Sequence, residues 1–299
     1  MRVLITGGSG FIGSHLAEHY QGKAEVRVLD NLRTGFRKNL DGIEVEFIEG
    51  SICDRALVKE AVQGVDYVFH LAALVSVPES MQKPQECVEI NVNGLLNVLE
   101  ESADAGVKKL CFASSAAVYG DNPLVPKLET MMPEPKSPYA ITKLDGEYYC
   151  GLFQSEGRLN TACLRFFNVF GPRQDPDGPY AAAVPIFFQK ALAGENLTIF
   201  GDGTATRDFI YVKDIVAALL HLVDHPDFSG VYNAGYGHST SIEFLARKIL
   251  QITNSSSEIV HAPNRPGDIK NSLANVDKLR NIGFYPSGDL MTGLKSLLP

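Results

Sequence analysis

The 299-residue sequence contains no tryptophan and only five cysteines. These cysteines are odd in number and widely spaced, and none forms a C-x-x-C pair, which argues against a disulfide framework and against a zinc site. The longest apolar stretches, such as residues 215–223, are much shorter than the roughly 20 residues that cross a bilayer. The sequence therefore predicts buried free thiols, no metal centre and no membrane span.

Basic residues are also sparse, because 27 Lys and Arg stand against 35 Asp and Glu, and no Lys/Arg-rich run occurs. With a net charge of -8, the chain is a poor partner for nucleic acid or an anionic membrane, although a local basic pocket can still bind a phosphorylated small molecule. Glycines interrupt the N-terminus before any apolar signal segment forms, so we expect a cytoplasmic protein without a signal peptide.

The composition that is present, with 45% hydrophobic and 21% charged residues, is typical of a globular protein of one large domain or two packed ones. Short β-branched runs at 3–6, 25–30, 45–49, 67–71, 110–114 and 161–166 alternate with helical patterns at 13–21, 55–62, 88–105 and 138–154. This alternation predicts an α/β fold with a doubly wound parallel sheet of the Rossmann type over residues 1–167. Loops rich in Pro and Gly then predict a smaller mixed α/β C-terminal lobe over 168–299, with some segments returning to the first domain.

A glycine-rich turn joins the first expected strand to the first helix. Gly7, Gly10 and Gly13 are three residues apart, which permits a tight turn, leaves bare backbone for a pyrophosphate and directs the helix N-terminus at that anion. A structural turn can share this spacing, but the strand-turn-helix context is the one that a dinucleotide site requires. The remaining residues expected at this site are Phe11, Ile12, Asn31, Ile52, Leu71 and Ala72.

Asp30 ends the second expected strand, where a carboxylate can accept hydrogen bonds from an adenosine ribose and repel a 2′-phosphate. This position favours NAD over NADP as the cofactor. Arg33 is close enough in sequence to weaken that preference, and a capping or turn role for Asp30 is the alternative.

Tyr139 and Lys143 form a Y-x-x-x-K pair whose spacing places both side chains on one face of a helix. Such a pair arises often by chance, so its weight comes from its place after a dinucleotide-binding half. Ser115 follows a strand at the carboxyl edge of the sheet, where ligands bind. Because a nearby ammonium and a positive nicotinamide both favour a phenolate, we expect Tyr139 to accept a proton from a substrate hydroxyl that Ser115 also holds.

The motifs Gly7-x-x-Gly10-x-x-Gly13, Asp30, Ser114-Ser115, Val118-Tyr119-Gly120 and Tyr139-x-x-x-Lys143 occur together in this chain. In this combination the chain resembles the extended short-chain dehydrogenase/reductase superfamily. Segments 164–173, 201–209 and 265–268 are similar to those of UDP-hexose 4-epimerases. Segments 76–78, 119–121 and 174–178, together with Ser272, are similar to those of UDP-N-acetylglucosamine 4-epimerases. The resemblance covers nearly the whole chain and implies an NAD-dependent isomerase of nucleotide-sugar metabolism in polysaccharide biosynthesis.

The resemblance also implies which residues hold a UDP-sugar. They are Asn168, Arg207 and Arg265 at the diphosphate, Asp268 at the ribose, residues 197–200 beside the uracil, and Ser76 and Ser115 at the sugar. Two guanidinium groups can make bidentate contacts with a diphosphate in an otherwise acidic protein. Either arginine could instead be a surface residue or pair with a neighbouring aspartate.

The residues after Ser115 bear on the type of reaction. Dehydratases of this superfamily carry an acidic pair there and UDP-glucuronate decarboxylases a Glu, whereas this chain has Ala116 and Ala117. Without a carboxylate to help eliminate water, the sequence favours 4-epimerisation through a transient 4-keto sugar. A UDP-uronic acid 4-epimerase, a UDP-glucuronate decarboxylase and, outside enzymes, an NAD-sensing regulatory protein are the alternatives.

Ser272 stands where some glucose-specific relatives carry a bulky Tyr, so the pocket is expected to accept an N-acetyl group. We therefore expect interconversion of UDP-GlcNAc and UDP-GalNAc, with UDP-Glc and UDP-Gal as a further pair. Ser51 and Val75 depart from the pattern and put an adenine contact and the width of the sugar site in doubt. Apolar stripes on residues 88–105 and 139–154 predict a homodimer, or alternatively a face buried within one chain.

Overall fold

The computed structural model describes residues 1–178, 181–264 and 269–298. The chain forms two compact units. Unit 1 comprises residues 1–120, 132–166 and 215–232, and unit 2 comprises residues 121–131, 167–214 and 233–299. Segment 121–131 thus leaves the first half for unit 2, whereas segment 215–232 returns to unit 1.

Unit 1 is built on a seven-stranded sheet of order β11-β6-β5-β4-β1-β2-β3. The strands are β1 (Arg2–Thr6), β2 (Glu25–Asp30), β3 (Glu46–Glu49), β4 (Tyr67–His70), β5 (Lys109–Ser115), β6 (Thr161–Phe166) and β11 (Gly230–Ala234). The six strands expected from the sequence are confirmed, and neighbours from β3 to β6 pair in parallel. The inner strands are largely buried because helices cover both faces of the sheet, whereas β3, at its edge, is only partly buried. The seventh strand, β11, was not expected.

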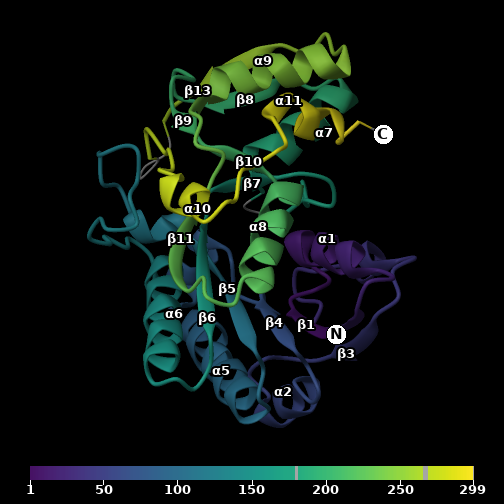
Figure 1. Ribbon diagram of the computed structural model, residues 1–299. Helices are drawn as coiled ribbons and strands as arrows, with labels where there is room; N and C mark the ends of the chain where they lie inside the picture. The colour runs from purple at the N-terminus through teal and green to yellow at the C-terminus, as the bar shows by residue number, and fades with distance from the viewer. Residues whose placement is uncertain (179–180, 265–268, 299) are drawn as a thin grey trace. The chain divides into compact units, whose positions relative to one another are not determined.

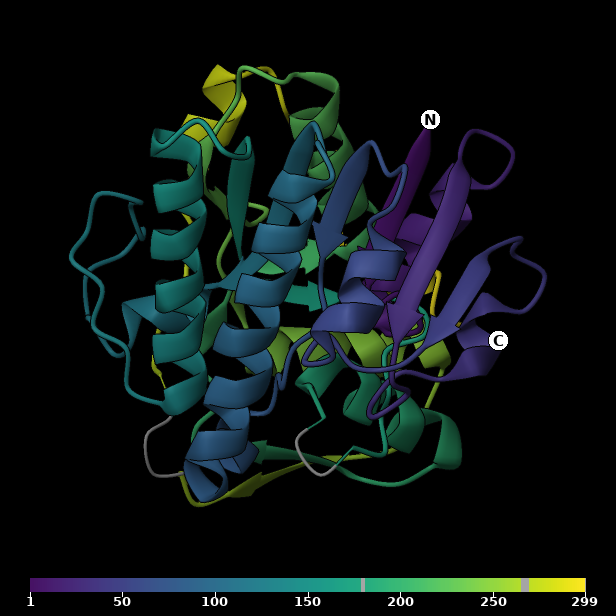
Figure 2. The ribbon, with the colours of Figure 1, turned by 90° about the horizontal axis from the view of Figure 1, so that it is seen from below.

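Helices flank this sheet on both sides (Figures 1 and 2). They are α1 (Phe11–Tyr20), α2 (Arg55–Ala61), α3 (Val77–Gln82), α4 (Pro84–Val88), α5 (Gly94–Asp104), α6 (Pro138–Ser155) and α8 (Val212–Asp224), with 3-10 turns at Arg37–Leu40 and Ala116–Tyr119. The helix expected at 88–105 is interrupted by a π-helical turn, Glu89–Asn93. Leu4, Val68, Leu95 and Leu110 are among the apolar side chains of the core between the sheet and its helices.

Lys109 ties the returning segment to the sheet of unit 1. Its fully buried ammonium donates hydrogen bonds to the carbonyl oxygens of Leu222 (2.7 Å), His225 (3.1 Å) and Phe228 (2.5 Å). These carbonyls lie at and just beyond the C-terminal end of α8, where backbone acceptors lack helical partners and a cation is favourable. The buried ammonium of Lys109 is therefore stabilised by the carbonyl groups at the C-terminal end of α8.

Unit 2 is a mixed α/β assembly of short elements. They are β7 (Asn168–Phe170), α7 (Ala183–Ala193), β8 (Leu197–Phe200), β9 (Thr206–Arg207), β10 (Phe209–Tyr211), β12 (Thr240–Ser241), α9 (Ile242–Thr253), β13 (Ile259–Ala262), α10 (Asp277–Asn281) and α11 (Leu290–Lys295). β10 pairs with β7 and β13 with β8 in parallel, whereas β12 and β9 are antiparallel. The expected strand at 197–200 is confirmed.

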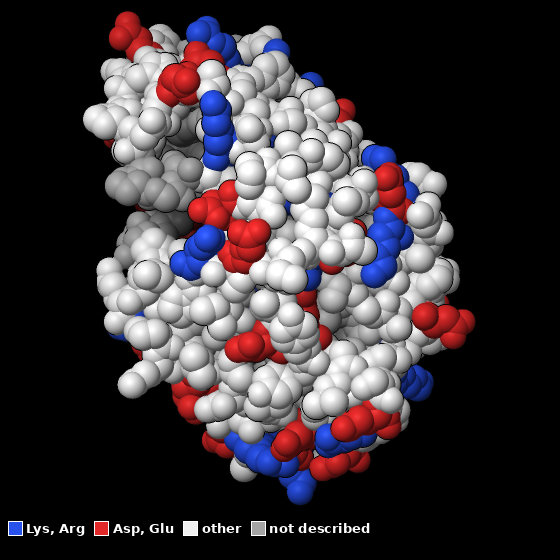
Figure 3. All heavy atoms as spheres, turned by 90° about the vertical axis from the view of Figure 1, so that its left-hand side faces the viewer, with Lys and Arg blue, Asp and Glu red and all other residues white. Residues whose placement is uncertain are grey.

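Several sequence expectations concern the surface and the thiols. Four of the five cysteines are buried and all five are free, although Cys53 is partly exposed. In the described part of the chain, no helix has the length and hydrophobicity to cross a membrane, and no group of three potential ligands could hold a metal ion. On the face drawn in Figure 3, the described Lys and Arg side chains lie among Asp and Glu rather than in one patch.

Candidate active site

The glycine-rich turn after β1 has the geometry of an anion cradle. Gly7 adopts a φ of 74°, in the left-handed region that favours glycine, and an added Cβ would lie 2.8 Å from the Ala72 nitrogen. A Cβ on Gly13 would lie only 2.4 Å from the Gly7 oxygen. At Gly10, by contrast, the Gly7 oxygen at 3.2 Å is the only atom of the described residues within 4 Å that an added Cβ would meet. Two glycines therefore permit the turn itself, and Gly10 leaves one side of it open.

Helix α1 begins directly at this turn, with Gly10 as its N-cap and no side chain capping it among the described residues. The backbone N–H groups of Phe11, Ile12 and Gly13 lie in its first turn and have no partner within the helix. A phosphate group can accept these hydrogen bonds and is stabilised by the helix dipole. The predicted role of these three residues thus agrees with their position.

Asp30 lies at the carboxyl end of β2 and is buried. One carboxylate oxygen accepts a hydrogen bond from the Ser9 nitrogen (2.8 Å), in the glycine-rich turn, and the other accepts one from the Leu32 nitrogen (2.8 Å). Asp30 therefore joins the turn to the loop after β2, and each oxygen keeps a lone pair for a further donor. The turn role and the ribose-binding role considered for this residue are compatible.

The remaining predicted cofactor residues surround the same edge of the sheet. The Leu71 nitrogen bonds the Thr6 oxygen, and the Ala72 nitrogen bonds the Thr6 hydroxyl, so both continue β4 beside β1. Ile52 is buried after β3. The Asn31 side chain accepts a hydrogen bond from the Arg33 nitrogen (3.2 Å).

Tyr139 and Lys143 lie on α6, one turn apart as predicted; Lys143 is buried and Tyr139 is half-buried. The Lys143 ammonium is 5.8 Å from the centre of the Tyr139 ring and donates a hydrogen bond to the Ala113 oxygen of β5 (2.7 Å). The Ser115 hydroxyl forms a hydrogen bond with the Tyr139 phenol and also accepts one from the Ala117 nitrogen (3.1 Å). Unit 1 therefore brings Ser115, Tyr139 and Lys143 together.

The electrostatics of this triad differ from the sequence argument. Burial raises the pKa of Tyr139 above its ordinary value, and the Ser115 hydrogen bond lowers it only in part. Burial also lowers the pKa of Lys143 to about 8. Desolvation therefore outweighs the attraction that the ammonium was expected to supply, and a cationic cofactor would have to favour the phenolate.

Two polar residues near the triad were missed by the sequence analysis. Burial lowers the pKa of His70, at the end of β4, to about 3, and its Nδ1 is 2.9 Å from the Thr6 hydroxyl. Asn91, in the π-helical turn, bonds both backbone groups of Leu74 (2.7 and 3.1 Å) and the Thr142 hydroxyl (3.0 Å). Asn91 thus holds the loop after β4 against the helix that carries the triad. The sequence signal that could have revealed Asn91 is a polar residue within an otherwise apolar helical pattern.

A buried ion pair lies one turn beyond Lys143. Arg165 of β6 makes two hydrogen bonds to the Glu147 carboxylate (2.8 and 2.7 Å), and Ser114 donates a third (2.5 Å). Ser114 and Arg165 face each other across the β5–β6 ladder. The contacts fix α6 against the strand that ends at Ser115. They also hold the carboxylate of Glu147 in a buried ion pair, so that it is not a free acid beside the triad.

Several predicted substrate residues lie in unit 2. Asn168 begins β7, and its nitrogen bonds the Asp208 oxygen (3.0 Å). Arg207 ends β9, while the Ser272 nitrogen bonds the oxygen of the preceding Thr206 (3.1 Å). The structure therefore groups Asn168, Arg207 and Ser272 around strands β9 and β10. Arg265 and Asp268 lie outside the described residues, and Ser76, in unit 1, caps α3 by accepting a hydrogen bond from the Glu79 nitrogen (3.1 Å).

Asp208, between Arg207 and β10, was not singled out from the sequence. It is fully buried, and its carboxylate accepts hydrogen bonds from the nitrogens of Tyr236 (2.8 Å), Gly237 (3.0 Å) and Ala274 (3.0 Å). Two separate backbone segments therefore depend on one side chain. Asp208 positions Arg207 and the stretch that includes Ser272.

Comparisons with known proteins agree with this geometry. The family model described as "NAD dependent epimerase/dehydratase family" matches residues 3–235. The chain belongs to the NAD-dependent epimerase/dehydratase family.

Relatives of this family member align over nearly its whole length. A putative UDP-glucose 4-epimerase of Methanocaldococcus jannaschii is 35% identical, covering 99% of this chain and 97% of the relative. A UDP-N-acetyl-alpha-D-glucosaminuronate decarboxylase of Bacillus cytotoxicus is 37% identical, with 99% and 96% covered. The structure of the UDP-N-acetylglucosamine 4-epimerase from Methanobrevibacter ruminantium, in complex with UDP-N-acetylmuramic acid, has a TM-score of 0.95, 39% identity and 99% and 96% coverage.

NAD is the cofactor of this epimerase/dehydratase family member. The open side of Gly10, the uncapped start of α1 and the carboxylate of Asp30 fit the pyrophosphate and adenosine ribose of such a dinucleotide. Arg33 does not weaken this preference, because its guanidinium is bonded to Glu79 (2.8 Å) and Glu86 (2.5 Å). The guanidinium of Arg33, which could otherwise attract a 2′-phosphate, is thus already paired with two carboxylates.

Proposed function

We propose that this protein is a UDP-sugar 4-epimerase that interconverts UDP-GlcNAc and UDP-GalNAc and also acts on UDP-Glc and UDP-Gal. The observation that carries the proposal is the triad of Ser115, Tyr139 and Lys143 brought together in unit 1, with Ala116 and Ala117 where an acid would serve elimination. The epimerase relatives support the same reaction.

In the proposed reaction, Tyr139 takes the proton of the 4-hydroxyl group while Ser115 holds the same oxygen by a hydrogen bond. NAD, when bound, would supply the acceptor for the C4 hydride and the donor that restores this hydride to the opposite face of the sugar. Tyr139 then gives the proton back to the carbonyl oxygen, so protons and electrons balance over one turnover. Lys143, held by the Ala113 carbonyl, keeps a positive charge beside the phenolate and binds the cofactor ribose.

The UDP portion is assigned to unit 2. Arg207 and Asn168 are proposed to contact the diphosphate together with Arg265, and Asp268 to contact the ribose. The small side chain of Ser272, adjacent to the strand that carries Arg207, supports a substrate with a bulky C2 substituent.

A second candidate is decarboxylation of a UDP-uronic acid, because one relative of similar identity is named as such a decarboxylase. Against it, Ala116 and Ala117 supply no carboxylate beside the triad, and Glu147 is committed to Ser114 and Arg165. A UDP-uronic acid 4-epimerase would use the same triad and remains the narrower alternative.

The test is mass spectrometry of NAD released from the denatured protein, followed by chromatography of a UDP-sugar panel. We expect co-purified NAD, interconversion of both pairs of 4-epimers without net NADH, and no carbon dioxide from UDP-glucuronate. Ser272→Tyr should reduce turnover of UDP-GlcNAc more than that of UDP-Glc, whereas the control Ser256→Tyr, in an exposed loop, should affect neither. Equal loss on both sugars would show that Ser272 does not face C2, and carbon dioxide release would favour the decarboxylase.

We also propose that the protein is a cytoplasmic homodimer. Five free cysteines suit a reducing compartment. On α6, the apolar residues Ile141, Tyr148 and Leu152 follow one stripe and are 46%, 64% and 49% exposed. In a homodimer, the same stripe on the α6 helix of the second chain would cover this surface. Light scattering should give a dimer for the native protein and a monomer for Tyr148→Asp, whereas Leu192→Asp, on another exposed apolar residue, should leave the dimer intact.

A further inference from the structure

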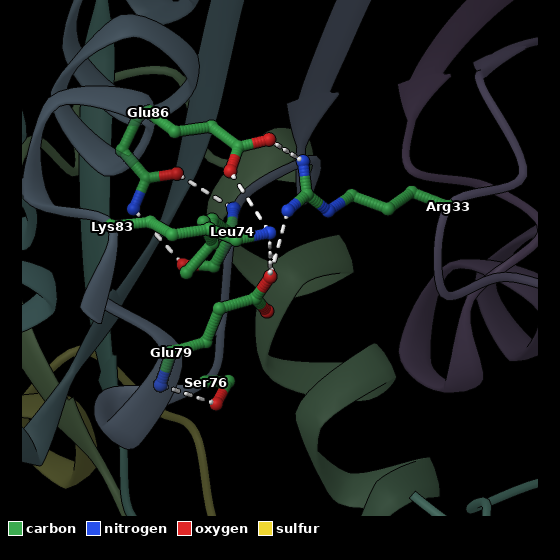
Figure 4. A network of polar contacts seen from close by, with 7 residues as sticks. Arg33, Leu74, Ser76, Glu79, Lys83 and Glu86 are labelled. Atoms are coloured by element: carbon green, nitrogen blue, oxygen red, sulfur yellow. Dashed lines mark hydrogen bonds and ion pairs between the residues drawn. The ribbon is translucent and has the colours of Figure 1, made fainter. Parts of the chain in front are cut away.

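Four charged side chains form a compact network beside the cofactor turn (Figure 4). Arg33 extends from the loop after β2 and donates hydrogen bonds to Glu79 of α3 and Glu86 of α4. Lys83 lies between the two carboxylates, 3.4 Å from each. Two positive and two negative charges thus balance, and ion pairing lowers the pKa of both glutamates, so the network is ionised at neutral pH.

The sheet order places the two ends of this network on opposite sides of the glycine-rich turn. β1 lies between β4 and β2, and the glycine-rich turn leaves the carboxyl end of β1. Arg33 comes from the segment after β2, whereas Glu79 and Glu86 come from the segment after β4. An ion pair that joins these two segments therefore connects the two sides of the turn at which a dinucleotide is expected to bind.

Both ends of the bridge are fixed by local structure. On one side, Leu32 adopts a φ of 56° and its nitrogen bonds Asp30, while the nitrogen of Arg33 bonds Asn31. On the other side, α3 is packed against the start of the catalytic helix, because the Tyr139 nitrogen donates to the Ser80 hydroxyl (3.2 Å). The ion pairs of Arg33 thus join two segments whose backbones are already held in place by other hydrogen bonds.

We propose that Arg33, Glu79 and Glu86 form an ionic clasp over the bound NAD, which must open before the cofactor can leave and so sets the rate of cofactor exchange. The proposal rests on the NAD site and not on the identity of the sugar. Because the three side chains are between 27% and 39% exposed, salt should screen the clasp. An enzyme that regenerates NAD in each turnover gains from such slow exchange.

The test follows replacement of protein-bound NAD by excess deuterated NAD, using mass spectrometry of the holoenzyme. Arg33→Met, and separately Glu79→Gln with Glu86→Gln, should exchange roughly three- to thirty-fold faster than the native protein. Exchange by the native holoenzyme should accelerate between low and high NaCl, and both variants should lose this dependence. The matched control is Arg2→Met, which breaks the ion pair between Arg2 and Glu25 at the opposite, amino end of the sheet.

A charge swap separates the clasp from a direct contact or a folding defect. Arg33→Glu combined with Glu79→Arg and Glu86→Gln should restore slow, salt-dependent exchange, because the ion pair re-forms with reversed polarity. Unchanged exchange in Arg33→Met would overturn the proposal. Fast exchange that the swap does not restore would also overturn it, because that result indicates that Arg33 contacts the cofactor itself.

Discussion

Burial rather than charge proximity dominates the chemistry of individual residues in unit 1. Lys143 and His70 are buried and Tyr139 is half-buried, and in each of them desolvation disfavours the charged form. The energetic cost is met at Lys143 by the Ala113 carbonyl and at His70 by neutrality beside Thr6. The protonation of Lys143 and of His70 should therefore affect the pH dependence of activity and of stability, respectively.

Lys143 should impose an alkaline limit on catalysis. Its pKa is lowered to about 8, so the charged fraction falls as pH rises through that value. We expect kcat/KM of the holoenzyme to decrease above about pH 8, and Lys143→Arg, which stays charged, to lack this decrease although its maximum is lower. The measurement is the pH profile of epimerisation between pH 6 and 10. A native profile that stays flat to pH 10 would contradict the assignment.

His70 should weaken the fold in acid. Its folded pKa is about 3 against an ordinary value near 6.5, so between these values the unfolded chain binds the extra proton and stability falls as pH falls. The His70 contribution to this slope is about 1 kcal/mol per pH unit. Urea unfolding at pH 7, 6, 5 and 4 should show a shallower decline in His70→Asn than in the native protein. The exposed control His238→Asn should keep the native slope.

At the scale of single elements, we expect two glycines of the turn between β1 and α1 to have different roles, with Gly13 needed for folding and Gly10 for NAD binding. Gly13→Ala should lower stability by about 1–3 kcal/mol, because the new Cβ would meet backbone atoms of the turn. Gly10→Ala should cost about 1 kcal/mol or less but weaken NAD binding about tenfold or more, because its Cβ enters the open side.

These glycine predictions are checked by urea unfolding and by the NAD content of the purified variants. Gly151→Ala is the control, since that helical glycine has open space around it and alanine should stabilise α6 by roughly 0.5–1 kcal/mol. The assignment fails if Gly10→Ala unfolds as readily as Gly13→Ala while keeping its NAD.

Elements with a local signature were predictable from sequence, and those made by distant contacts were not. Most of the strands from β1 to β6 are rich in apolar residues because both faces of the sheet are covered, and the glycine and Tyr-Lys spacings follow from one turn and one helix. β11 was missed, because its pairing with β6 joins residues far apart in the chain. The partners of Arg33, and the pairing of Glu147 with Arg165, likewise depend on packing between elements.

On the scale of the whole molecule, unit 1 is discontinuous, and its first 166 residues are incomplete without residues 215–232. A protein ending at Phe167 would leave the edge of β6 open and the ammonium of Lys109 without its carbonyl partners. We expect this truncated protein to bind the dye ANS, to lack near-UV circular dichroism and to be cut rapidly by trypsin. A native-like spectrum with protease resistance would show that unit 1 folds without its returning segment.

The same return of the chain has a consequence during synthesis on the ribosome. At typical translation speeds, roughly 3 to 13 seconds separate the emergence of β6 from that of β11. Throughout this interval the nascent polypeptide displays an unpaired strand edge that could bind other partly made chains. Chaperones that shield such edges should therefore matter more for the yield of this protein in cells than its final stability suggests.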